Sequence, residues 1–168
     1  MSLSMHRASV PAFVQILTAL SLILDKAAAH CAARKIDPAV LLNARLFPDM
    51  LPFTKQVQIA CDFAKNALAR LSGTEAVKFA DDEKSFDELK ARIARTLDLI
   101  KAAKPESIDG SEDRDVTVPI GGQPMTFKGE AYLVSSVLPN FYFHAATAYD
   151  ILRHNGVEIG KRDFLGPR

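Results

Sequence analysis

Cysteine is scarce in this chain, which contains only Cys31 and Cys61 among its 168 residues. Disulfide-dependent secreted domains carry more cysteines, and zinc or redox motifs place them in close CxxC pairs. Both cysteines instead lie in apolar stretches with helical spacing. We therefore interpret them as reduced thiols in or near a core.

A block of charge of one sign is also absent, because 21 basic residues balance 20 acidic ones and leave a net charge of +1. Sequence-independent binding to nucleic acid or to an anionic membrane depends on a concentrated basic patch. The sequence therefore predicts no nucleic-acid partner and no membrane partner.

The chain has no uninterrupted hydrophobic run of membrane-spanning length. Residues 10–24 are strongly apolar, but they contain Pro11 and three polar residues and are followed by Asp25 and Lys26. A span needs about 20 apolar residues, so we interpret this stretch as a buried helix. We expect a cytoplasmic location, and we hypothesise that residues 1–4 are an expression leader.

Catalytic signatures are missing as well: there is no HExxH, no GxSxG, no P-loop and no glycine-rich dinucleotide fingerprint. His30 and His154 lie near expected helix ends, where a favourable interaction with the helix dipole explains them. Cys31 follows His30 directly, but adjacent helical residues point about 100° apart and do not face each other, so the pair is a weak signal for a nucleophile.

The composition is that of a globular domain, with 48% hydrophobic and 24% charged residues. We expect one domain over residues 1–168, with residues 157–168 as a C-terminal tail. Apolar residues recur every three or four positions in four long segments, which predicts four helices. Their expected ranges are residues 9–35, residues 50–72, a third helix from either residues 81–82 or a Ser85 cap to about residue 104, and residues 129–156.

Shorter elements connect the helices. Residues 40–42 are expected to form a short turn capped by Asp37, and residues 106–115 an exposed acidic loop. Residues 116–120 and 123–127 alternate around Gly121 and Gly122, which predicts a β-hairpin. The expected fold class is therefore all-α, a four-helix bundle with a small hairpin between helices three and four.

Polar residues interrupt the apolar stripe of the last helix. Asn140, His144 and Thr147 occupy positions i, i+4 and i+7, so they share one helix face. A neutral imidazole there is suited to binding a metal or carrying a proton, although a histidine satisfied within a core has the same pattern. The neighbouring Tyr142 is a candidate for an aromatic pocket wall, which ordinary core packing also explains.

The second helix carries Gln56, Gln58 and Asp62 within an alanine-rich segment. One of them is a candidate to face His144. Gln58 and Asp62 share one face and Gln56 lies on another, so at most part of the set points inward. The predicted ligand-binding residues are thus Asn140, His144, Thr147, Gln56, Asp62 and Tyr142.

Residues 140–156 resemble the closing helix of the DinB-like (YfiT-like) four-helix-bundle superfamily. Residues 45–50 (RLFPDM), 56–63 (QVQIACDF) and 160–166 (GKRDFLG) are similar to its bacterial domain-of-unknown-function 1993 branch. The resemblance covers nearly the whole chain. It implies the DinB-like bundle, and superfamily members commonly form dimers, so a homodimer is expected.

The resemblance also implies where a metal site would lie. Metal-binding members use one histidine of the second helix and an HxxxH pair of the last, which suits zinc or nickel and activates water or a thiol. Here the pair is Asn140 and His144, and the second helix has no histidine. Only His144 is retained, and a degenerate site with Asp49 or Asp62 is a hypothesis.

Three functions follow as hypotheses. The first is a small-molecule-binding module or enzyme remnant with a degenerate metal site around His144, without a required cofactor. The second is a divalent-metal-dependent transferase or hydrolase of the thiol-transferase kind. The third is a structural dimeric protein.

Overall fold

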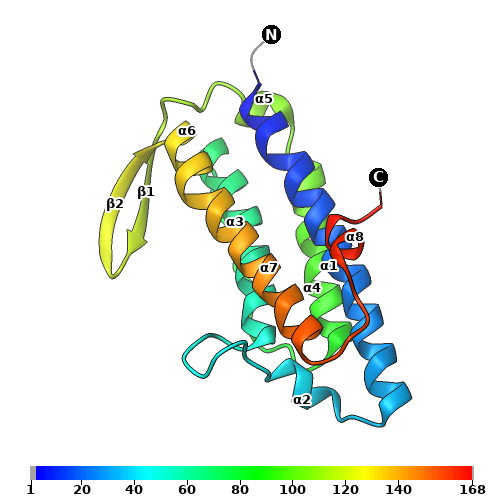
Figure 1. Ribbon diagram of the computed structural model, residues 1–168. Helices are drawn as coiled ribbons and strands as arrows, with labels where there is room; N and C mark the ends of the chain where they lie inside the picture. The colour runs from blue at the N-terminus through cyan, green and yellow to red at the C-terminus, as the bar shows by residue number, and fades with distance from the viewer. Residues whose placement is uncertain (1–2, 168) are drawn as a thin grey trace.

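Four long helices form the body of the computed structural model, which describes residues 3–167 (Figure 1). They are α1 (Met5–Arg34), α3 (Phe53–Ser72), α4 (Phe86–Ala102) and α7 (Leu138–His154). Helices α1 and α3 each pack against both α4 and α7, so the four close into a bundle. The predicted fold class is confirmed.

Helices α3 and α4 run in the same direction. Their first residues, Phe53 and Phe86, pack edge to face with ring centroids 6.2 Å apart. The connection at residues 73–85 must therefore return along the length of the bundle. Lys65 donates to the Val77 carbonyl and Arg92 to the Ala80 carbonyl, each at 2.8 Å, and these bonds tie the connection to the two helices.

The last helical segment changes character along its length. It starts with α6 (Gly129–Ala131), widens into the π-helical segment η1 (Tyr132–Val137) and continues as α7. Gly129 is required at the start, because a Cβ atom there would lie 1.9 Å from the Ser111 carbonyl oxygen. π-Helical turns inside α-helices frequently occur at functional sites.

The predicted hairpin is confirmed, with β1 (Asp115–Ile120) paired to β2 (Gln123–Lys128) in antiparallel register. Gly121 and Gly122 form the turn with φ values of 58° and 80°, a conformation that glycine adopts without steric cost. Figure 1 shows the hairpin projecting to one side of the bundle, beside the start of the last helix.

Three short helices complete the fold: α2 (Pro38–Leu42), α5 (Pro105–Ile108) and α8 (Lys161–Leu165). The expectation of an exposed loop at residues 106–115 is partly wrong. Pro105 begins the helical turn α5, and Ile108 anchors it in the core with no exposed surface. The C-terminal segment is also structured, since α8 packs on α1 and Lys26 pairs with Asp163 at 2.6 Å.

Helix boundaries differ slightly from the expected ones. Helix α1 begins at Met5, because Ser4 caps it by accepting a hydrogen bond from the Arg7 amide at 3.4 Å. Ser4 is thus part of the fold, whereas residues 1–2 of the hypothesised leader lie outside the described residues. Of the two proposed starts for α4, the Ser85 cap is confirmed, with Ser85 Oγ accepting from the Glu88 amide at 3.2 Å.

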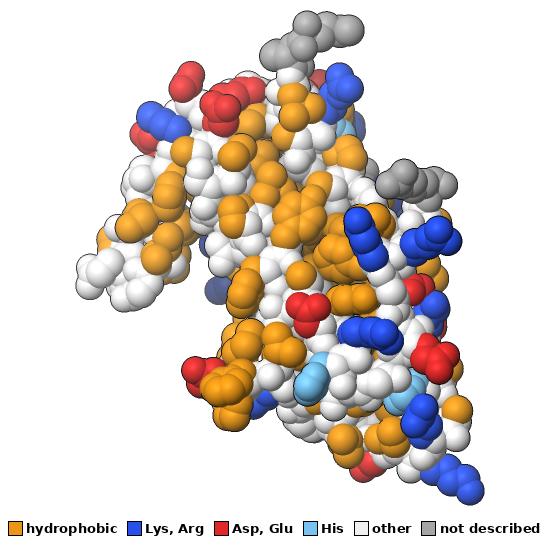
Figure 2. All heavy atoms as spheres, viewed as in Figure 1, with side chains coloured by type: hydrophobic (Ala, Val, Ile, Leu, Met, Phe, Trp, Pro, Cys, Tyr) orange, Lys and Arg blue, Asp and Glu red, His pale blue; other side chains and the backbone are white. Residues whose placement is uncertain are grey.

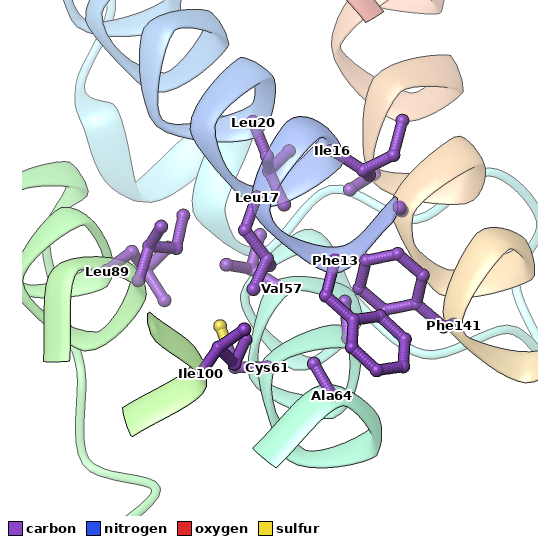
Figure 3. Packing of buried hydrophobic residues seen from close by; sticks show 14 of the residues in the cluster. Phe13, Ile16, Leu17, Leu20, Val57, Cys61, Ala64, Leu89, Ile100 and Phe141 are labelled. Carbon is purple, nitrogen blue, oxygen red and sulfur yellow. The ribbon is translucent and has the colours of Figure 1, made fainter. Parts of the chain in front are cut away.

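The core is filled by apolar side chains from all four long helices (Figure 3). Phe13 of α1 and Phe141 of α7 face each other edge to face, with centroids 4.9 Å apart. Burying a phenylalanine contributes about 1.5–3 kcal/mol to folding. Cys31 and Cys61 are free and buried as expected, and burial raises the pKa of Cys61 to about 12.

Helix α1 meets the length and hydropathy criteria for a membrane span, the only helix within residues 3–167 to do so. Core helices of soluble proteins and signal sequences meet the same criteria. Half of its most apolar window is buried inside the bundle, which agrees with the interpretation of this stretch as a buried helix.

Candidate functional site

His144 lies at the edge of the buried stripe of α7 and contacts α3. Its Nδ1 atom is 2.7 Å from Gln56 Oε1. The Gln56 amide nitrogen donates to the Leu51 carbonyl at 3.0 Å, so its oxygen is the atom left to face the imidazole. That oxygen can only accept, and His144 Nδ1 must therefore carry the proton while Nε2 keeps its lone pair.

The surroundings of His144 keep the imidazole neutral. Burial lowers the pKa of His144 below its ordinary value of 6.5. The Phe63 ring stacks on the imidazole with centroids 5.8 Å apart and an interplanar angle of 19°, and Phe143 packs its edge against the same ring. His144 is thus a base that is hydrogen-bonded to Gln56 and flanked by the rings of Phe63 and Phe143.

The other two polar residues of α3 turn away from His144. Gln58 donates to Glu83 Oε2 at 2.7 Å, and Asp62 accepts from Arg92 at 2.9 Å and lies 3.2 Å from Lys65 Nζ. Gln56 is therefore the α3 residue that contacts His144. The sequence left this choice open.

Asn140 is exposed, which corrects the interpretation that it interrupts a buried face. The buried stripe of α7 passes through Phe141, Ala145 and Ala148, and each helical residue is rotated by about 100° from the next. Asn140 consequently lies beside the stripe, where its Nδ2 donates to the Ser136 carbonyl at 2.7 Å.

Thr147 and Tyr142 complete the predicted set but lie apart from the His144 contact. Thr147 is buried, and its hydroxyl donates to the Phe143 carbonyl of its own helix at 2.7 Å. Tyr142 is 39% exposed and packs against Phe141. Neither side chain hydrogen-bonds to His144 or Gln56.

A groove of about 370 Å³ lies between α3, the hairpin and η1–α7. Figure 2 shows the molecule hollowed between the hairpin and the bundle. We call this the hairpin groove, and its lining residues are Ile59, Asp62, Phe63, Asn66, Arg70, Val118, Pro119, Ile120, Tyr132, Ser136 and Asn140. Phe63 belongs both to this lining and to the stack on His144, so the groove and the histidine share one wall.

Asn140 and Asp62 are the predicted site residues that line the groove, and the sequence analysis missed most of the others. Arg70 and Tyr132 are notable, because Arg70 Nη1 donates to the Tyr132 hydroxyl at 2.8 Å. The sequence does contain a pattern that could have identified part of the lining. Ile59, Phe63 and Arg70, with Asn66 between them, recur at helical spacing on one face of α3.

The residues around His144 do not fit the divalent metal that the resemblance implies. Within residues 3–167, no three His, Cys, Asp or Glu side chains converge as a ligand set. Gln56 and Asn140 offer amides, which are poor ligands for zinc or nickel, and the Asp62 carboxylate is already engaged by Arg92 and Lys65. Asp49 is exposed in the loop before α3.

The four-helix bundle with its hairpin is the fold of a DinB-like protein. The structure of a DinB family member protein from Shewanella denitrificans matches with a TM-score of 0.91 and 39% identity, covering 97% of this chain and 92% of that one. None of the curated proteins matches.

The particular family is equally clear. The profile described as "Domain of unknown function (DUF1993)" matches residues 5–165, and the chain belongs to this family. The expected superfamily and branch are confirmed.

Proposed function

We propose that this protein is a small-molecule-binding module whose site is the hairpin groove, with His144 stacked behind the Phe63 wall of that groove. The observation that carries the proposal is the groove itself, with a volume of about 370 Å³ and a lining that combines apolar side chains with polar ones in similar number. Ligand sites in proteins typically have this size and combine apolar walls with polar groups that fix the orientation of the ligand.

His144 supports the same proposal from behind the groove wall. Gln56 fixes its tautomer, and Phe63 lies between the imidazole and the groove. A ligand that contacts Phe63 would change the environment of His144.

Metal-dependent transfer or hydrolysis is the weaker alternative, because the donor set around His144 lacks two of the three imidazoles that such a site uses. The predicted homodimer and cytoplasmic location stay predictions. A measurement of solution mass tests the first.

A thermal-shift screen of metabolites and thiols tests the proposal. A compound at about 100 times its Kd adds about 2.7 kcal/mol of stability, which raises the Tm by about 5–10 °C for a domain of this size. Asn140→Trp fills the groove at an exposed position and should abolish the shift.

Asp150→Trp is the matched control, since Asp150 is exposed on the same helix and does not line the groove. It should keep the full shift. The proposal fails if no compound stabilises the protein, or if stabilising compounds act equally on the Asn140→Trp variant.

A further inference from the structure

Arg70 places a positive charge in the hairpin groove without a balancing carboxylate. Across residues 3–167, no Asp or Glu oxygen lies within ion-pair distance of its guanidinium. Its one side-chain hydrogen bond is the donation from Nη1 to the Tyr132 hydroxyl. A guanidinium has five N–H donors, so most of its donor capacity is open to a ligand.

Tyr132 supplies a second donor at the same place. The residue is only 1% exposed, and its hydroxyl oxygen accepts from Arg70. The hydroxyl hydrogen has no acceptor among the described residues. Burial raises the pKa of Tyr132, so the phenol keeps this proton at neutral pH. A buried hydroxyl normally donates to a partner, and a ligand oxygen in the groove would fill that role.

Asp62 is the one carboxylate in the groove lining, and its charge is already balanced. Arg92 donates to it at 2.9 Å and Lys65 Nζ lies 3.2 Å away, with both cationic side chains almost fully buried. The unbalanced charge of the groove is therefore the single positive charge of Arg70. This charge favours a ligand with one negative charge.

The apolar part of the lining determines which tail the ligand can have. Ile59 and Phe63 line the α3 side, and residues 118–120 of β1 line the hairpin side. Such walls accept an alkyl or aryl tail, because burying it removes apolar surface from water.

We propose that the ligand of the hairpin groove is a small organic carboxylate with an apolar tail. This inference rests on the proposed function. The carboxylate pairs with the Arg70 guanidinium and accepts the Tyr132 hydroxyl hydrogen, while the tail lies between α3 and the hairpin. Arginine binds carboxylates through two parallel hydrogen bonds, which gives both affinity and orientation.

Calorimetric titration with hexanoate and hexanamide tests the inference, since the two probes have the same tail and differ in head-group charge. The wild-type protein should bind hexanoate at least about tenfold more tightly than hexanamide. Arg70→Met should abolish this preference. Tyr132→Phe should weaken hexanoate more than hexanamide, because only the carboxylate loses a charge-assisted hydrogen bond.

Two controls separate charge from folding. Arg153→Met removes an exposed arginine of α7 that does not line the groove and should keep the preference for hexanoate. Arg70→Lys keeps the charge and should keep part of the preference, with circular dichroism confirming that each variant is folded.

Equal binding of the two probes, or no binding of hexanoate, would overturn the inference. A preference that survives in Arg70→Met would also overturn it. The proposed function fails on a different result, namely the absence of any stabilising compound of any charge in the thermal-shift screen.

Discussion

Two faces of α3 carry polar side chains that serve different ends. On the face toward α4, which we call the closed face, Gln58, Asp62 and Lys65 join a network of ion pairs and hydrogen bonds around Arg92, in which the buried Gln58 Oε1 and Arg92 Nε atoms make no hydrogen bond. On the face toward α7 and the hairpin, Gln56 pairs with His144, and Arg70 keeps unused donors. The closed face holds the fold together, and the open face has groups left for a ligand.

The closed face is built around a guanidinium whose side chain is only 1% exposed. Arg92 lies 2.9 Å from an Asp62 oxygen and 3.0 Å from oxygens of Asp81 and Glu83. Asp81 and Glu83 belong to the long connection between α3 and α4. The network therefore ties this connection to both helices.

Breaking the closed face should have the largest effect. Arg92→Met leaves three carboxylates without their common partner, and removing one member of a buried ion pair costs about 3–5 kcal/mol. We expect about 3 kcal/mol, because Asp62 and Asp81 are partly exposed to water. Urea denaturation measures the loss.

Arg95→Met is the control on the same helix, since Arg95 is exposed, stacks on Phe79 and forms no ion pair with any residue of the stretch 3–167. It should cost less than about 1 kcal/mol. Equal losses in the two variants would contradict the assignment of the network to Arg92.

The contact between Gln56 and His144 should be the next most important. Gln56→Leu keeps a similar side-chain volume but removes the acceptor for His144 Nδ1 and the donor to the Leu51 carbonyl. Leaving such groups unpaired costs about 1–3 kcal/mol. The same denaturation experiment applies, and a change below about 0.5 kcal/mol would argue against this contact.

The two faces should also differ in their response to pH. The folded-state pKa of His144 lies below 6.5, so the unfolded chain binds its proton first. Stability should fall as the pH drops from about 6.5 through the folded-state pKa, by less than the Gln56→Leu loss. Gln56→Glu adds a carboxylate beside the imidazole and should weaken or reverse this dependence.

The closed face should affect stability at lower pH than His144 does. The hydrogen bond from Lys55 holds the pKa of Asp81 below its ordinary value of 3.8. The contribution of the ionised Asp81 to folding stability is present above pH 3.8 and is lost as the pH falls through its folded-state pKa. Stability measured from pH 8 to 2 should decline in two steps, and His144→Gln should remove the upper one only.

The smallest effect is expected in thiol labelling, where neither cysteine should react in the native protein. Cys61 is fully buried next to Thr96 and Arg92 on the closed face, and its pKa of about 12 keeps it a thiol. Ellman's reagent should modify neither Cys61 nor the buried Cys31 until the protein is unfolded. Fast labelling of Cys61 in the native protein would show that the α3–α4 face opens.

The sequence predicts the fold well because the signals are local. Apolar spacing locates the four helices, Ser85 marks the start of α4, and the glycine pair marks the hairpin. The π-helical segment was not predicted, since it has no distinct local pattern. The burial of Ile108 within an acidic stretch also depends on packing with distant helices.

The site is less predictable because it joins residues far apart in the chain. His144 and Gln56 are 88 positions apart, and Arg70 and Tyr132 are 62 apart. Helical spacing identifies His144 as a polar break, but it cannot say which residue of α3 meets it. Helical spacing also wrongly predicts that Asn140 is buried. One position along a helix corresponds to a turn of about 100°, which is enough to move a side chain from the buried face to the exposed one.

Methyl NMR spectra of the protein with a stabilising compound test the central claim most directly. The account predicts shifts of the Ile59, Val118 and Ile120 methyl signals, which report on the hairpin groove. The signals of Val77 and Leu99, which line a separate hollow between α3 and α4, should stay in place. Shifts confined to Val77 and Leu99 would place the ligand on the other side of α3 and contradict the account.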